Sequence, residues 1–145
     1  MGVGYSTYAF EDVSCVLRHP SVGSFAVNGA GVGSITFAMT NDVTEHETAA
    51  DGTVMVSKIK SGNGTIVIEV QQTSPLHQWL TKFYNYVTVA SSTEWAQMGI
   101  LASSPAMQVT HDCSGVSPQK RGDKPYQAQG QMVSWTLMAA IMREY

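Results

Sequence analysis

The clearest hydrophobic pattern in the chain predicts one amphipathic helix over residues 75–87. Apolar side chains recur there three or four positions apart, which places them on a single face: Leu76, Trp79, Leu80, Phe83, Tyr84 and Val87. Ser74 suits the N-cap, and Pro75 suits the first helical position because its missing N–H is not needed there. We expect Leu76, Trp79, Leu80 and Phe83 to anchor this helix in a core.

Two alternating segments on either side of residues 61–64 predict a β-hairpin. They cover residues 53–60 and 65–72, and the Gly- and Asn-rich stretch between them favours a tight turn. With a turn of this length Val56 would face Glu69, and side chains would alternate between two faces. The core face would hold Met55, Ser57, Ile59, Ile66, Ile68 and Val70. The other, polar face would hold Val54, Val56, Lys58, Lys60, Thr65, Val67, Glu69 and Gln71.

Alternation elsewhere predicts further strands, within residues 9–17, 24–27, 34–40, 99–103, 107–116 and 132–141. In the segment 34–40, Ile35, Phe37 and Met39 alternate with the small or polar residues Ser34, Thr36, Ala38 and Thr40. The predicted fold class is therefore mainly β: an antiparallel β-sandwich or half-barrel with one flanking α-helix, in a single domain over residues 1–145.

The segment 41–52 breaks the alternation of apolar and polar residues. It is acidic and nearly without large apolar groups, and its polar members are Asn41, Asp42, Glu45, His46, Glu47 and Asp51. A segment this polar cannot belong to a core, and it is too long for a hairpin turn. We expect it to form an extended loop.

Composition disfavours several function classes. Only 13% of the 145 residues are charged and the net charge is −3, so the basic surface typical of a nucleic-acid-binding protein is missing. No apolar run is long enough for a membrane-spanning helix, and the N-terminus lacks the pattern of a signal peptide, so we expect an intracellular origin. Cys15 and Cys113 show no metal-binding spacing and are expected to be buried free thiols.

Three short motifs could suggest catalysis or ligand binding, but each has a simpler interpretation. Residues 45–47 read Glu-His-Glu, yet neighbours in an extended segment point in opposite directions. The same argument applies to residues 111–113, where His and Cys would have to meet as base and nucleophile. The glycines at 29, 31 and 33 precede a strand, which indicates a turn instead of a nucleotide-binding loop. We therefore expect no catalytic residue, metal site or cofactor.

The order of these parts resembles the tail-tube proteins of contractile-tailed bacteriophages. The most specific segments are Asp51-Gly52-Thr53-Val54-Met55, Thr73-Ser74-Pro75-Leu76 and Trp135-Thr136, and the resemblance extends over nearly the whole chain. It implies a non-enzymatic structural protein whose homohexameric rings stack into a hollow inner tube for DNA ejection. The implied partners are the sheath, tape-measure protein, baseplate hub and tail terminator, and the implied location is the virion tail, assembled in the host cytoplasm.

Within such a tube, the polar hairpin face would line the lumen. The residues assigned to it are Ser34, Thr36, Lys58, Lys60, Thr65, Val67, Glu69 and Gln71, mostly small or weakly charged, so passing DNA would not be held. The loop 41–52 would join one ring to the next. Two alternatives remain open: a tube subunit of a type VI secretion system or R-type pyocin, and a small ligand-binding β-barrel module.

Overall fold

Nine strands and one α-helix form the described part of the chain, which covers residue 4 and residues 7–27, 31–122 and 126–145 of this computed structural model. In chain order the elements are η1 (Phe10–Asp12), β1 (Ser14–His19), β2 (Gly23–Val27), β3 (Val32–Met39), β4 (Thr44–Thr48), β5 (Val54–Lys58), β6 (Gly64–Gln71), α1 (Pro75–Val89), η2 (Ser92–Glu94), β7 (Met98–Ser104), β8 (Val109–Lys120) and β9 (Met132–Glu144). The glycine-rich turn expected at residues 29–33 lies partly outside the described residues.

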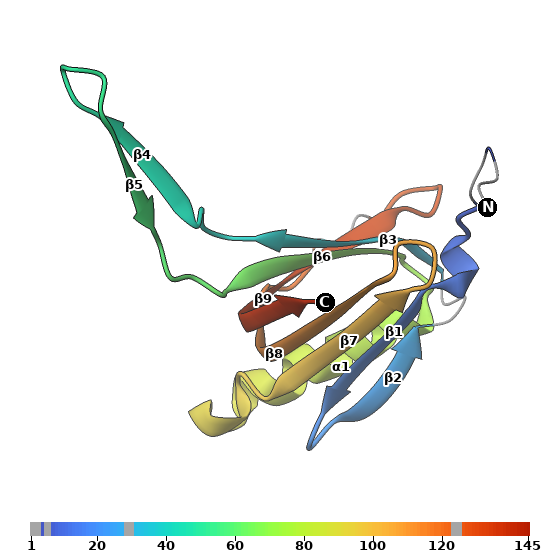
Figure 1. Cartoon of the computed structure of the whole chain (residues 1–145). Helices are drawn as coiled ribbons and strands as arrows, with labels where there is room; N and C mark the ends of the chain where they lie inside the picture. The colour runs from blue at the N-terminus through green and yellow to red at the C-terminus, as the bar shows by residue number, and fades with distance from the viewer. Residues whose placement is uncertain (1–3, 5–6, 28–30, 123–125) are drawn as a thin grey trace.

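One antiparallel sheet contains seven of these described strands, in the order β2-β1-β7-β8-β9-β6-β3 (Figure 1). The sheet curls so strongly that Phe37 on the edge strand β3 stacks on His111 of β8, with ring centroids 4.4 Å apart and planes 4° apart. In the order of the sheet, β6 and β9 lie between these two strands. The predicted fold class, a mainly β half-barrel with one helix, is confirmed.

The inner face of the half-barrel is apolar, as the alternation of the strands predicts. Along β6 and β9, every second side chain is fully buried: Ile66, Ile68 and Val70 in β6, and Val133, Trp135 and Leu137 in β9. The intervening residues are more exposed and point to the other face of the sheet. A sheet with one apolar face must cover that face, and α1 together with the curled halves of the sheet does so.

Helix α1 begins as predicted, because Ser74 Oγ accepts a hydrogen bond from Leu76 N at 3.1 Å and Pro75 follows the cap. Leu76, Leu80 and Phe83 are fully buried, whereas Trp79 is partly buried and packs against the core. The amphipathic stripe marks the face of the helix that turns inward; it does not tell how deeply each position is covered. Trp79 lies at the margin of that face and stacks on Phe83.

A buried side-chain hydrogen bond joins α1 to β9 of the sheet. Trp135 Nε1 donates a hydrogen bond to Nδ1 of His77 at 3.0 Å, and both residues are buried. Buried polar groups need such partners, because an unsatisfied donor or acceptor costs about 1–3 kcal/mol. Sequence analysis missed His77, although it lies three residues before Leu80 and seven before Tyr84, on the same face as the apolar stripe.

The predicted hairpin between residues 53–60 and 65–72 is wrong. Val56 lies opposite His46 in a separate two-stranded sheet of β4 and β5, while Glu69 lies between Ser34 and Ser134 in the large sheet. Consequently Met55, Ser57 and Ile59 are exposed and do not join the core, whereas Ile66, Ile68 and Val70 do. Strand β6 has a strictly apolar inner face. Its two neighbours β3 and β9 each carry an apolar face that continues it across the sheet.

Residues 40–60, here called the arm, stand away from the rest of the chain (Figure 1). Every residue of the arm is exposed. Its base is held by Asn41, whose Nδ2 donates to Ser61 Oγ at 3.3 Å and to Asn63 Oδ1 at 3.2 Å. Its tip is closed by a hydrogen bond from Thr53 N to Asp51 Oδ1 at 3.0 Å. The expected loop 41–52 is thus one half of a projecting β-hairpin.

Candidate assembly surfaces

The outer face of β3, β6 and β9 carries mainly small and polar side chains, together with the exposed side chains of Met132 and Met138. Cross-strand pairing places Ser34, Glu69 and Ser134 in one row, and Thr36, Val67 and Thr136 in the next. Ser34 Oγ donates to Glu69 Oε2 at 3.3 Å, which holds the carboxylate against the sheet. Glu69 is the one charged side chain among these six. The surface is largely polar and weakly charged, so it offers few positive charges that could hold the phosphates of a passing nucleic acid.

Six of the eight residues predicted to share one polar face do lie together. Ser34, Thr36, Thr65, Val67, Glu69 and Gln71 belong to the paired strands β3 and β6. Lys58 and Lys60 do not join them, because β5 pairs with β4 and residue 60 belongs to the arm. Their assignment to this face depended on the predicted hairpin and is wrong for the same reason. Ser134 and Thr136, on the opposite side of β6, complete the face.

The arm has two chemically different faces. Thr44, His46 and Thr48 lie opposite Lys58, Val56 and Val54, and residues opposite one another share a face. We call this the valine face. Glu45 and Glu47 lie opposite Ser57 and Met55 on the other, acidic face. Val54 and Val56 are 48% and 61% exposed, so the valine face leaves apolar surface uncovered. Exposed apolar side chains grouped on a projecting element mark a contact surface.

Both edges of the large sheet are open in the single chain. β2 and β3 each have one hydrogen-bonded neighbour in the described residues, so the outer side of each carries unpaired backbone N–H and C=O groups. The edge of β3 is the longer, with eight residues, Val32–Met39. An open edge of this length is a template for pairing with another chain.

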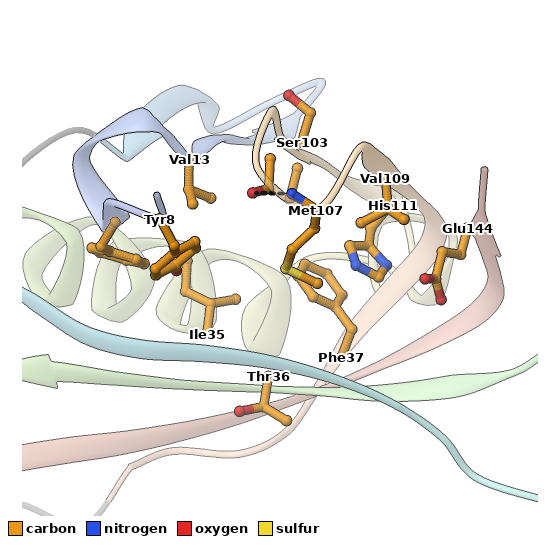
Figure 2. A pocket seen from close by; sticks show the side chains of 13 residues that line it. Tyr8, Val13, Ile35, Thr36, Phe37, Ser103, Met107, Val109, His111 and Glu144 are labelled. Atoms are coloured by element: carbon orange, nitrogen blue, oxygen red, sulfur yellow. Dashed lines mark hydrogen bonds between the residues drawn. The ribbon is translucent and has the colours of Figure 1, made fainter. Parts of the chain in front are cut away.

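A groove of about 370 Å³ opens between β3, the β7–β8 turn and the segment around η1 (Figure 2). Figure 2 shows Phe37 against His111 and the side chain of Met107 reaching toward Phe37, while Thr36 points to the opposite side of β3. Tyr8 and Met107 are more than half exposed, at 58% and 59%. The Nδ1 atom of His111 is buried and has no hydrogen-bond partner among the described residues. The sequence held no signal for this groove, because its lining comes from four separate segments.

The described residues contain no group of three or more His, Cys, Asp or Glu side chains arranged to hold a metal ion. Glu45, His46 and Glu47 alternate along the exposed strand β4. Cys15 and Cys113 are buried free cysteines, as expected from the sequence. Burial raises the pKa of Cys15 to about 12 and that of Cys113 to about 11, so both thiols stay protonated and unreactive. No helix in the described ranges is long and apolar enough to cross a membrane.

Comparisons with known proteins agree with this architecture. The family model described as "Bacteriophage PhiTE tail tube protein" matches residues 5–144. No curated protein matches the sequence. Among solved structures, the chain is similar to one from the PVC sheath–tube complex of an extracellular contractile injection system in its extended state. That match has a TM-score of 0.62 and 13% identity, and it covers 99% of this chain and 93% of the other.

Two further structures share the fold. A chain of the PVC sheath/tube terminator has a TM-score of 0.63 at 12% identity, covering 99% of this chain and 99% of the other. A chain of the tube-terminating cap of the anti-feeding prophage has a TM-score of 0.59 at 13% identity, covering 100% of this chain and 94% of the other. At these identities, the similarity shows the fold.

Proposed function

Because the chain belongs to the bacteriophage PhiTE tail tube protein family, we propose that it assembles as homohexameric rings that stack into the inner tube of a contractile phage tail. The family is structural, so the chain is a structural component of a phage tail and not an enzyme. In the proposed tube, the outer face of β3, β6 and β9 lines the lumen. The arm connects one ring to the next, which corresponds to the role expected of residues 41–52.

The observation that carries the proposal is the polar outer face of β3, β6 and β9. A wide conduit needs a wet wall that neither sticks to DNA nor collapses, and small hydroxyl side chains with one restrained carboxylate meet that need. The open edges of β2 and β3 support the ring, because pairing each edge with the next copy removes unpaired backbone groups. A ligand-binding module would not require a long open edge.

The proposed partners follow from the tube. A sheath would surround it, a tape-measure protein would occupy the lumen during assembly, and a baseplate hub and tail terminator would contact its two ends. Similar chains in solved structures come from complexes described as sheath–tube, terminator, cap and baseplate assemblies. DNA would pass through the lumen without sequence recognition, and the mature location would be the virion after assembly in the host cytoplasm.

Negative-stain microscopy of the purified protein tests the assembly. We expect sixfold rings that stack into hollow tubes as the concentration rises. A monomer at every concentration, with a melting temperature that responds to a small ligand, would instead identify a binding module. Tubes together with neighbouring genes for secretion components, in place of sheath and tail genes, would assign the same part to a type VI secretion system or pyocin.

Single cysteines test which face lines the lumen. In a background with Cys15 and Cys113 replaced by alanine, Val67→Cys should react with a bulky maleimide in free rings and be protected in long tubes. Leu101 is 44% exposed on the outer face of β7, so Leu101→Cys is the matched control and should react in both states. Ile68→Cys is buried and should react only after denaturation. Protection of position 101 with free reaction at position 67 in tubes would reverse the assignment.

A further inference from the structure

We propose that the groove beneath β3 is the receptor for the arm of a second copy of this chain, which inserts its valine face there. The inference rests on the proposed function, because it assumes that copies stack. It goes further by naming both surfaces of the contact. Neither surface is covered within the single chain: the arm is exposed along its whole length, and Tyr8 and Met107 at the groove are more than half exposed.

Apolar chemistry matches on the two sides. The groove is lined by aromatic and aliphatic side chains, with Phe37 stacked on His111 and Met107 beside them (Figure 2). The valine face presents Val54 and Val56, both about half exposed or more. Placing the two valines against this lining would remove apolar surface from water on both partners. Methionine is suited to such a receptor, because its flexible side chain adapts to the surface that it meets.

Charge selects which face of the arm enters. Glu144 lies at the groove and is exposed. The valine face carries the cation Lys58 and no acidic residue, whereas the acidic face carries Glu45 and Glu47. The carboxylate at the groove therefore attracts the valine face and repels the acidic one.

The positions of arm and groove favour an assembly that continues. In Figure 1 the arm leaves the body on the side away from η1, whereas the groove lies beside η1. A contact between two different surfaces of identical copies is heterologous, so each copy keeps one free arm and one free groove after binding. Such a contact extends into a stack instead of closing as a dimer, which is what a tube requires.

The experiment compares stacking of rings that carry a defect on one side of the contact. The arm variant is Val54→Asp with Val56→Asp, and its matched control is Met55→Asp, an equally exposed apolar residue on the acidic face of the same strand. The groove variant is Met107→Asp, and its control is Val89→Asp, which is 85% exposed at the end of α1. Circular dichroism and ring formation check that each variant folds and assembles laterally.

We expect both variants to form rings that do not elongate, while both controls form tubes of wild-type length. The decisive sample is a mixture of the two defective rings. Rings of the arm variant keep an intact groove, and rings of the groove variant keep an intact arm, so the mixture should yield pairs of rings that grow no further. If the groove variant forms normal tubes while the arm variant does not elongate, the groove is not the receptor, and the proposed function remains intact.

Other outcomes separate the remaining explanations. Normal tubes from the arm variant would overturn both the inference and the stacking role of the arm. A wild-type protein that forms no rings would overturn the proposed function itself. A cross-linking experiment tests the same contact without measuring tube length. In a background with Cys15 and Cys113 replaced by alanine, tubes of the double variant Val56→Cys, Met107→Cys should give an intersubunit disulfide ladder on mild oxidation. Neither single cysteine variant should give it, and a double variant without the ladder in assembled tubes would contradict the contact.

Discussion

The hydrogen bond between Trp135 and His77 allows a quantitative test of how the helix is held on the sheet. Trp135→Phe keeps a large ring in a fully buried site but removes the donor to His77 Nδ1. Removing the donor of a buried hydrogen bond costs about 1–3 kcal/mol. The smaller ring also leaves a cavity, which adds to this cost. We expect the free energy of unfolding to fall by about 2–4 kcal/mol, a large share of the roughly 5–15 kcal/mol typical of a domain.

Trp79→Phe is the matched control for this test. Trp79 is half-buried and stacks on Phe83 with ring centroids 5.8 Å apart, so a phenyl ring can keep much of the contact and should cost less than about 1.5 kcal/mol. Urea unfolding followed by circular dichroism at one protein concentration measures both variants. Trp135→Phe should lower the midpoint by roughly 1–2 M, using a slope near 2 kcal/mol/M. An equal or larger loss for Trp79→Phe would refute the reasoning.

Two further predictions follow from the buried thiols and from the left-handed backbone conformation of Gly115. Burial raises the pKa of Cys15 to about 12 and that of Cys113 to about 11, above the ordinary value of 9.0. The thiols of the unfolded chain therefore ionise before those of the folded chain, and the free energy of unfolding should fall as the pH rises above about 9. Cys15→Ala should flatten that loss in pH-dependent urea melts, and rapid thiol labelling of folded protein at neutral pH would contradict the burial. Gly115→Ala should cost about 1–3 kcal/mol, since φ is +64° and a Cβ would lie 2.8 Å from that of Ala140. Gly52 also has a positive φ, +92°, but no atom lies within 4 Å of its Cβ position and it lies at the tip of the arm, so the strain of Gly52→Ala should stay in the arm and leave the thermal unfolding of the sheet unchanged. Equal melting of both glycine variants would contradict this.

Local periodicity in the sequence determined the helix and the inner faces of the strands. The spacing of Leu76, Leu80 and Phe83 predicts the buried face of α1, and alternation in residues 65–70 and 132–137 predicts which side chains enter the core. These features depend on the geometry of a single segment, 3.6 residues per turn in a helix or two per repeat in a strand. They can therefore be read without knowing the neighbours of that segment.

Only the tertiary structure decided which strands pair. The Gly- and Asn-rich stretch at residues 61–64 predicts a turn equally well whether it closes a hairpin or joins the arm to β6. Strand β6 pairs with β3 and β9 because each offers an apolar face from a distant part of the sequence, and no local pattern reports that competition. Segment 53–60 is left to pair with residues 44–48, and the arm results.

The same distinction applies to the candidate surfaces. Ser34, Thr36, Val67 and Glu69 share a polar face that their strand alternation predicts, because each residue's own strand sets its side. The groove depends on the curl of the whole sheet, which brings Phe37 onto His111 across two intervening strands. The depth of Trp135 relative to Trp79 likewise depends on where α1 crosses the sheet. Burial depth, strand partners and cavities arise from contacts between distant segments, and only the folded chain contains them.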